Sequence, residues 1–245
     1  MNIAILGYGK MGREIEQISI DRKHKIICKI DKGSNNKSLS GADVAINFST
    51  PETAFENISL ALENSIPVIC GTTGWLNDFD KVIELSNRTN TSFLYSSNFS
   101  LGVNLFFELN KKLAAIMKGY NQYELSIEEI HHKEKLDKPS GTAISIAEDI
   151  INNSDYKEWS FKNNNKDIIK MSSKRIDKVP GTHTTKYSSD IDSIEIKHTA
   201  NNRKGFALGA VIAAEWISEL RTSIWKLSAV CQVTNLDVGE CSGGH

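Results

Sequence analysis

Short apolar runs alternate with helical stretches over the first 104 residues, and this alternation constrains the fold more than any other feature. Runs that are apolar throughout and rich in Ile and Val are typical of strands buried on both faces of a parallel sheet. Between two of the runs, Phe55, Ile58 and Leu62 recur on one face of a helix that opens at Pro51. The alternation therefore predicts right-handed βαβ units in an open α/β sheet. The five predicted strands cover residues 2–6, 25–30, 43–47, 67–70 and 92–95.

The turn after the first run has the glycine spacing of a dinucleotide-binding loop. "GYGKMG" places Gly7, Gly9 and Gly12 as G-x-G-x-x-G, which allows a tight turn, close backbone approach to a pyrophosphate and close helix packing. Asp31 directly follows the second run, where an acidic side chain binds ribose hydroxyls. A triplet alone also fits a purely structural turn, but the whole pattern predicts a Rossmann-type doubly wound parallel sheet that binds NADH or NADPH. Lys32 is either a partner for the 2′-phosphate of NADPH or a solvated surface side chain.

Two further loops, "CGTTG" (70–74) and "SSNFS" (96–100), follow the fourth and fifth runs. Ligands of open α/β sheets lie beyond the carboxyl ends of the strands. The small and hydroxyl residues of these loops are therefore candidates to line the nicotinamide end of a cofactor site. As isolated motifs, both are equally compatible with ordinary loops.

The pattern changes after residue 104 and predicts a second, α+β domain over residues 105–204. Residues 123–130 and 192–198 alternate apolar and polar side chains, which is the signature of strands with one solvated face. The Asn-rich passage 152–167 between them is predicted to be a surface connection.

The strongly apolar segment 206–220 is predicted to be a helix with small residues, including Gly209 and Ala213, along one face. Such a face suits close packing, so we expect this helix to pack against the first domain. Residues 205–245 would then complete the dinucleotide-binding domain that residues 1–104 begin.

Net charge and cysteine usage narrow the classes of function. The formal net charge is −1 at pH 7, so no basic field favours nucleic acid or a membrane surface as a partner. No apolar run approaches the roughly 20 residues that cross a bilayer, and the N-terminus is not typical of a signal peptide. The 4 cysteines stand far apart without a C-x-x-C pair, which favours a reducing, cytoplasmic location.

The segment "EEIHHKEKLDKPSGTA" (128–143) combines adjacent histidines and lysines with a turn that opens a helix. Either hydroxyl of the turn 140–142 can cap that helix, and the glycine between them leaves room for a ligand. His131, His132 and Lys135 precede a helix N-terminus, whose N–H groups and dipole attract anions. Several cations at a helix N-terminus repel one another and the positive end of the helix dipole unless an anion binds there. The segment therefore predicts an acidic substrate with more than one carboxylate.

Two alternatives apply to this segment. Adjacent histidines can ligate a metal, but neighbours on a strand point to opposite faces, and no suitably spaced Cys or third His completes a tetrahedral set. Lys133 and Lys138 are most simply solvated loop side chains.

With these motifs assembled, the chain resembles the 4-hydroxy-tetrahydrodipicolinate reductase (dihydrodipicolinate reductase) family of diaminopimelate and lysine biosynthesis. The family signature Glu-x-His-His-x-x-Lys-x-Asp-Ala-Pro-Ser-Gly-Thr-Ala reads here "EIHHKEKLDKPSGTA", with Lys138 in place of the usual alanine. The segments "GYGKMGR", "NFSTPE", "CGTTGW", "SSNFSLGVN", "GTHTT" and "HTANNRKGFALGA" match further. From about residue 222 the chain departs from the usual family ending.

The resemblance implies an enzyme, usually a homotetramer built by its second domain, that reduces a cyclic imine dicarboxylate with NADH or NADPH. It implies that His131 donates or accepts a proton and that Lys135 donates one. The substrate carboxylates would bind to His132, Ser140, Gly141 and Thr142. The cofactor would bind to Gly7, Tyr8, Gly9, Lys10, Met11, Gly12, Asp31, Gly71, Thr72, Thr73, Ser96, Ser97, Asn98 and Phe99.

Two other functions share part of this pattern. A nicotinamide-dependent dehydrogenase of another amino-acid intermediate shares the glycine turn, but it gives no reason for His-His-x-x-Lys before Pro-Ser-Gly-Thr. A regulator that senses NADH without turnover should lack both a proton donor and an anion site. Oxidation of NADH in the presence of the substrate distinguishes the enzyme from the regulator.

Overall fold

The computed structural model describes residues 1–31, 33–34, 38–162, 165–202, 204–219 and, for the backbone, 224–226. Lys32 and most of the C-terminal segment after residue 222 lie outside the described residues. The chain forms two compact units. Unit 1 comprises Met1–Leu101 together with Lys204–His245, and unit 2 comprises Gly102–Arg203.

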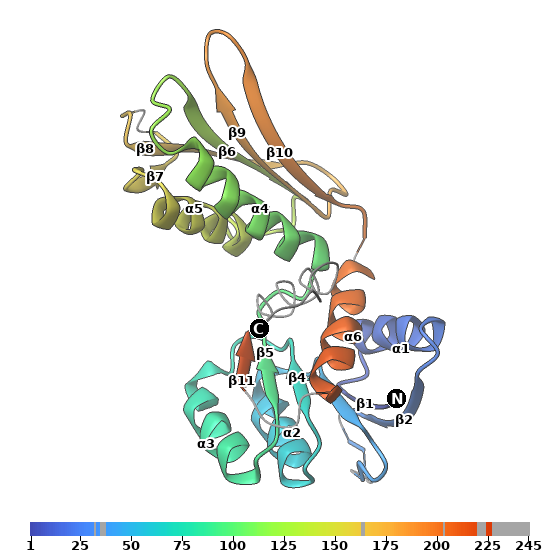
Figure 1. Cartoon of the computed structure of the whole chain (residues 1–245). Coiled ribbons are helices and arrows are strands. Elements are labelled where there is room, and N and C mark those ends of the chain that lie inside the picture. Colours follow the sequence, from blue (N-terminus) through green and yellow to red (C-terminus); the bar gives the residue numbers. More distant parts are fainter. Residues whose placement is uncertain (32, 35–37, 163–164, 203, 220–223, 227–245) are drawn as a thin grey trace, which may run out of the picture. The chain divides into compact units, whose positions relative to one another are not determined.

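Unit 1 is built on a parallel six-stranded sheet with the order β11-β5-β4-β3-β1-β2 (Figure 1). The chain leaves β1 for β2 on one side and returns to β3 on the other, so the sheet has a switch point between β1 and β3. Ligands of doubly wound sheets bind at the carboxyl ends of the strands beside such a point. The strands are β1 (Asn2–Leu6), β2 (Lys25–Ile30), β3 (Val44–Asn47), β4 (Val68–Cys70), β5 (Phe93–Tyr95) and β11 (Ile224–Lys226).

Helices cover both faces of this sheet because successive strand residues send apolar side chains to opposite sides. Ile3 and Ile5 pack with α1 and α6 on one face, whereas Ala4 and Leu6 pack with α2 and α3 on the other. The helices are α1 (Lys10–Asp21), α2 (Pro51–Glu63), α3 (Phe79–Thr89) and α6 (Lys204–Glu219), with a short 3-10 turn η1 (Leu76–Asp78) before α3.

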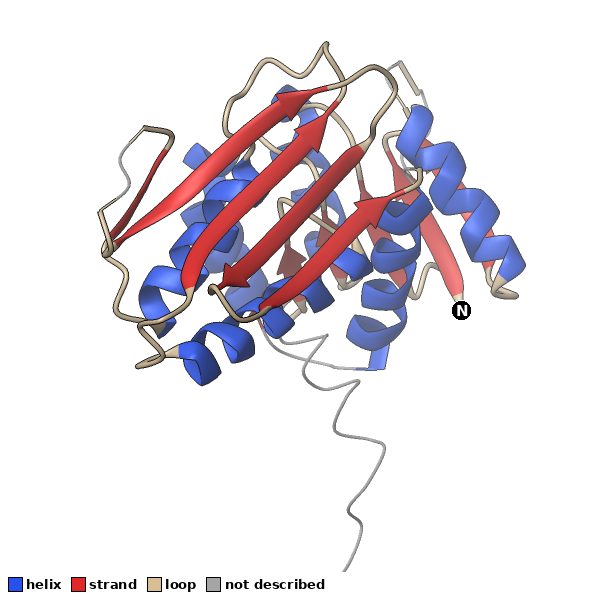
Figure 2. Ribbon diagram, turned by 90° about the horizontal axis from the view of Figure 1, so that it is seen from above, coloured by secondary structure: helices blue, strands red, loops and turns tan. Residues whose placement is uncertain are grey.

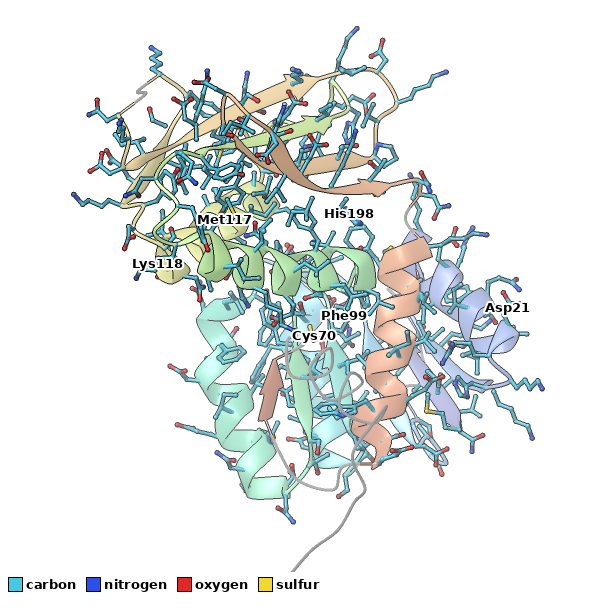
Figure 3. All side chains as sticks on the ribbon, turned by 45° about the horizontal axis from the view of Figure 1, so that its top comes forward. Asp21, Cys70, Phe99, Met117, Lys118 and His198 are labelled. Atoms are coloured by element: carbon cyan, nitrogen blue, oxygen red, sulfur yellow. The ribbon has the colours of Figure 1, made fainter. Side chains whose placement is uncertain are left out.

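The last helix, α6, packs closely because it carries glycine and alanine on its buried side. A Cβ added at Gly209 would lie 1.8 Å from the carbonyl oxygen of Phe99, so only glycine fits at this contact. The side chain of Phe99, labelled in Figure 3, lies in the same core as the apolar residues of α6. The prediction that the helix 206–220 packs against the dinucleotide-binding sheet is therefore confirmed.

Unit 2 is a mixed five-stranded sheet with the order β10-β9-β6-β8-β7. β6 pairs parallel with β8 and antiparallel with β9. Helices α4 (Leu101–Met117) and α5 (Gly141–Asn153) lie on one face of the sheet (Figures 1 and 2), where they bury Ile127 and Ile146 among other apolar side chains. The strands are β6 (Glu124–His131), β7 (Glu158–Ser160), β8 (Ile168–Arg175), β9 (Gly181–Ser188) and β10 (Ser193–Ala200).

One prediction for unit 2 is wrong. The polar passage 152–167 is not a simple connection, because it contains β7, which pairs parallel with β8 from Glu158 to Ser160. The pairing is short and lies at the edge of the sheet, so its side chains need no apolar pattern. Among the residues that the structure describes, no helix is both long and apolar enough to cross a bilayer.

Candidate active site

The glycine turn of unit 1 leaves the start of α1 open to a ligand. Gly7 has φ +95°, and a Cβ added at Gly12 would lie 2.4 Å from the Gly7 carbonyl oxygen, so the turn and the helix are in close contact. A Cβ at Gly9 would meet nothing within 4 Å. Gly9 is the N-cap of α1, and neither a described side chain nor an acidic residue of the first turn satisfies the free N–H groups. These residues fit the pyrophosphate of a dinucleotide cofactor.

A cavity of about 220 Å³ lies beside this turn at the carboxyl ends of β3 and β4. Its floor is the ring of Phe48, which leaves so little room that a Cβ at Gly71 would lie 2.2 Å from the ring. The Thr72 hydroxyl accepts a hydrogen bond from the Ser49 N–H at 2.9 Å, which ties the loop after β4 to the loop after β3. The lining residues are Met11, Phe48, Ser49, Pro51, Gly71, Thr72 and Thr73. Four predicted cofactor residues, Met11 and Gly71 to Thr73, are thus brought together.

The remaining predicted cofactor residues lie in different settings. Tyr8 is held by its hydroxyl, which donates to Glu16 and accepts from Lys29 Nζ at 3.2 Å. The loop after β5 is ordered internally: the Ser96 hydroxyl donates to the Asn98 carbonyl at 2.9 Å. Phe99 is 1% exposed and belongs to the core, so its side chain is not available to a ligand. Lys10, Asp31 and Ser97 are exposed.

The inner face of the unit 2 sheet changes from apolar to polar along its length. β6 first presents Leu125 and Ile127 to the helices and then, at the same alternation, the buried Glu129 and His131. The register places Glu129 beside Ser173 of β8 and opposite His183 of β9. The next inward position of β8, Arg175, lies beside His131. A polar cluster is therefore built from three adjacent strands.

Glu129 is the centre of this cluster, and its side chain is 0% exposed. The backbone N–H of Ser140 donates to the two carboxylate oxygens at 3.2 and 3.1 Å, and the Ser173 hydroxyl donates to Oε1 at 2.5 Å. Arg175 Nη1 and Nη2 each donate to Oε1 at 3.3 Å. Burial by itself raises the pKa of Glu129, but the proximity of His131 and the hydrogen bonds from Ser140 and Ser173 outweigh it and hold the pKa well below the usual value. The carboxylate is therefore ionised.

The two buried histidines flank Glu129 and pack against each other. Their ring centroids are 5.0 Å apart in an edge-to-face arrangement. His131 Nδ1 lies 3.3 Å from Glu129 Oε2 without the alignment of a hydrogen bond. Burial, followed by the charge of His131, lowers the pKa of His183 to about 3, so His183 is neutral. The backbone of Gly181 contacts the other edge of the His131 ring, because a Cβ at Gly181 would lie 3.1 Å from Nε2.

The loop between β6 and α5 carries the predicted proton donor. Lys135 Nζ pairs with Asp137 Oδ1 at 2.8 Å, and the lysine side chain is 25% exposed. Arg175 holds the loop backbone, since Nε donates to the Lys135 carbonyl at 3.2 Å and Nη2 donates to the Asp137 carbonyl at 2.5 Å. The charge of Lys135 also contributes to the lowered pKa of His183.

The turn before α5 is fixed on one side and open on the other. Ser140 is the N-cap: its hydroxyl accepts from the Ala143 N–H at 3.2 Å and lies 3.4 Å from His183 Nε2. A Cβ at Gly141 would meet nothing within 4 Å, and Gly141 is exposed. Thr142 and His132 are half-buried. The exposed part of the turn can therefore receive an anion, while Ser140 is committed to internal contacts.

Glu129, His131 and His183 also have the composition of a metal site, with one ligand atom from each within 4.8 Å of the others. However, Arg175 and the Ser140 N–H already occupy the carboxylate oxygens, and the guanidinium would repel a cation. The arrangement suits an ion pair between protein groups better than a metal ion.

Sequence reasoning missed the residues that support the predicted ones. Glu129 stands in the signature, and His183 stands in the matched segment "GTHTT", but neither was given a role. Arg175 and Ser173 lie outside the matched segments. The available signal for Glu129 was its position two residues before His131, on the inward face of a predicted strand.

The chain matches known proteins along most of its length. Residues 1–99 match the family model "Dihydrodipicolinate reductase, N-terminus" and residues 102–231 match "Dihydrodipicolinate reductase, C-terminus". The second match continues beyond residue 222, so the expected end of the resemblance was placed too early. A 4-hydroxy-tetrahydrodipicolinate reductase from Christiangramia forsetii is 52% identical over 233 residues, which cover 94% of this chain and 97% of the relative. The protein of the same description from Rickettsia bellii is 35% identical, covering 93% of each chain.

Solved structures share the fold. A dipicolinate-bound dihydrodipicolinate reductase from Paenisporosarcina sp. TG-14 superposes with a TM-score of 0.73 at 21% identity, over 92% of this chain and 97% of the other. A probable dehydrogenase from Thermotoga maritima gives a TM-score of 0.60 at 9% identity, over 95% and 93% of the two chains. The chain therefore belongs to the dihydrodipicolinate reductase family and is an oxidoreductase.

Proposed function

We propose that the chain reduces 4-hydroxy-tetrahydrodipicolinate to tetrahydrodipicolinate with NADH or NADPH, a step of diaminopimelate and lysine biosynthesis. The observation that carries this function is the 52% identity to a curated reductase, which extends over both units. The glycine turn of unit 1 and the histidine–lysine cluster of unit 2 supply the two kinds of site that the reaction needs.

In unit 1, the nicotinamide cofactor supplies a hydride when it is bound. Residues Gly7 to Gly12 would hold its pyrophosphate at the start of α1, and Asp31 would bind a ribose. Gly71 to Thr73 and Ser96 to Phe99 would line the remaining part. The open space at Gly9 and the cavity over Phe48 support this assignment.

In unit 2, His131 and Lys135 would handle protons. Loss of water from the hydroxy substrate gives a conjugated cyclic imine, and hydride addition to it builds negative charge on carbon and nitrogen. Nearby cations stabilise such charge, and an acid must quench it. Lys135 would donate this proton and His131 would donate or accept one. His132, Ser140, Gly141 and Thr142 would hold the two carboxylates, with the Ser140 contribution limited by its internal hydrogen bonds.

We further propose that unit 2 builds a homotetramer and that the enzyme is cytoplasmic. Polar side chains on the face of its sheet opposite α4 and α5, such as Ser126, Lys170 and Lys186, line part of a hollow of about 1220 Å³, and the end of α4 with the loop after it lines another part. A second copy of the chain is the expected cover. Light scattering after size-exclusion chromatography should give four times the chain mass, and a monomer would exclude this assembly.

The activity is tested by oxidation of NADH and of NADPH with the freshly made condensation product of pyruvate and aspartate semialdehyde. We expect substrate-dependent oxidation of one or both cofactors, and their relative rates give the preference. Tight NADH binding together with oxidation at the background rate would instead favour a regulator that senses NADH.

A further inference from the structure

One buried carboxylate connects all the parts of the candidate site in unit 2. Glu129 contacts β8 through Ser173 and Arg175, the start of α5 through the Ser140 N–H, and the end of β6 through His131. Its side chain is 0% exposed, and the Arg175 side chain is 16% exposed. Water therefore does not substitute for any of these contacts.

We propose that Glu129 is a positioning residue: its carboxylate, paired with Arg175, orients the His131 imidazole for proton transfer and anchors the loop that carries Lys135. This inference rests on the proposed function, because it assigns the proton chemistry to His131 and Lys135. Glu129 itself does not need to touch the substrate.

The first part of the inference concerns the His131 ring. An anionic oxygen 3.3 Å from Nδ1 favours the tautomer with its proton on Nδ1. Nε2 is then the nitrogen that exchanges a proton. A histidine ring is either neutral or positive, so His183 cannot supply a negative charge, and Glu129 is the described carboxylate beside the histidine pair.

The second part concerns the loop. The guanidinium group of Arg175 donates hydrogen bonds to the Glu129 carboxylate. The same group also donates to the backbone carbonyls of Lys135 and Asp137. Arginine can do this because its planar group carries five N–H donors in fixed directions. The negative charge of Glu129 thereby fixes the orientation of the group that holds the Lys135 backbone.

The direct test is Glu129→Gln, which keeps the size of the side chain and an acceptor oxygen but removes the charge. We expect kcat to fall on the order of 10- to 100-fold, with a smaller change in substrate KM and an unchanged NADH dissociation constant. Glu148→Gln makes the same change on the exposed side of α5 and should behave as the wild type.

A double-mutant cycle separates positioning from general stabilisation. If Glu129 acts through His131, Glu129→Gln should lower kcat much less in a His131→Ala background than in the wild type. Equal fold-losses in both backgrounds would overturn the inference.

Ser173 gives a milder test in case Glu129→Gln does not fold. Ser173→Ala removes the 2.5 Å hydrogen bond to Glu129 Oε1 but leaves every charge in place. We expect a loss of several-fold in kcat, and Ser173→Thr, which keeps the hydroxyl, should restore most of it. Full activity of Ser173→Ala would count against the inference. A wild-type chain that fails to oxidise NADH with the substrate would instead contradict the proposed function.

Discussion

Gly12 packs directly on the carbonyl oxygen of Gly7. A Cβ added at Gly12 would lie only 2.4 Å from that oxygen. Gly9, between them, faces open space. The same G-x-G-x-x-G turn therefore contains one glycine that the packing of the protein requires and one glycine whose open side leaves room for a ligand.

Alanine at these two positions should give different results. Gly12→Ala forces the backbone of the turn to shift, so we expect a loss of about 1–3 kcal/mol in the free energy of unfolding and weaker NADH binding. Gly9→Ala should melt like the wild type but bind NADH at least about 10-fold more weakly, because the methyl group meets the pyrophosphate. Thermal melting and fluorescence titration measure both effects. Equal stability of the two variants would contradict the packing argument.

Lys135→Ala should lower kcat by about 10²- to 10⁴-fold, the range expected for loss of a general acid. NADH binding should change little, because the glycine turn lies in unit 1. Lys133→Ala is the matched control, since Lys133 is exposed and pairs with Asp177 at 3.0 Å. Steady-state kinetics with a near-normal kcat for Lys135→Ala would exclude it as the proton donor.

His183 should make the stability depend on pH. Its pKa is lowered from 6.5 to about 3 in the folded chain, so between these values the unfolded chain binds a proton that the folded chain does not. The stabilisation is complete above pH 6.5 and is lost as the pH falls, by up to about 1.4 kcal/mol per pH unit. We expect the free energy of unfolding, measured with urea between pH 7 and pH 4, to change less steeply with pH for His183→Asn than for the wild type. The same dependence of unfolding free energy on pH in both proteins would mean that His183 is not buried in its neutral form.

Asn110 links three elements of unit 2 from a fully buried position. Its Nδ2 donates to the Ile146 carbonyl at 3.1 Å, and its Oδ1 accepts from the Thr185 hydroxyl at 3.0 Å. Asn110→Ala removes both hydrogen bonds and leaves the buried Thr185 hydroxyl without this partner, which should cost about 1–3 kcal/mol in the free energy of unfolding. Asn121→Ala, at an exposed turn position, should leave chemical denaturation unchanged. Matching midpoints for the two variants would count against the buried network.

Hydrophobic patterning located β1 to β5 of unit 1 but not β11, and it was insufficient for part of unit 2. The predicted strands 2–6 and 25–30 match β1 and β2 at both ends. β1 is apolar along its buried length, as expected for a central parallel strand, and β2 at the sheet edge still keeps Ile and Cys between its two lysines. β9 reads "GTHTTKYS" and turns Thr, His and Tyr inward, so it has no alternation of apolar and polar residues. Nor did β8, "IIKMSSKR", allow a prediction, because its inner face changes from Ile169 and Met171 to Ser173 and Arg175.

The candidate site shows the same limit for a physical reason. His131 and Lys135 were predicted from a local cluster of charge next to a helix start. Two of their supporting residues, Ser173 and His183, lie 44 and 54 positions after Glu129 in the chain, and only the sheet register brings them beside it. Local sequence carries no record of such a register when the paired positions are polar.

The first unit owes part of its core to α6, which follows the whole of the second unit in the chain. A ribosome therefore releases every residue of the mixed sheet before it releases the helix that covers Ile3 and Ile5. Until then, the part of this face of the parallel sheet that α6 covers in the folded chain is exposed to water or to a chaperone, while α1 covers its own part. The order of synthesis lets the inserted unit mature first and makes the nucleotide-binding half the last to close.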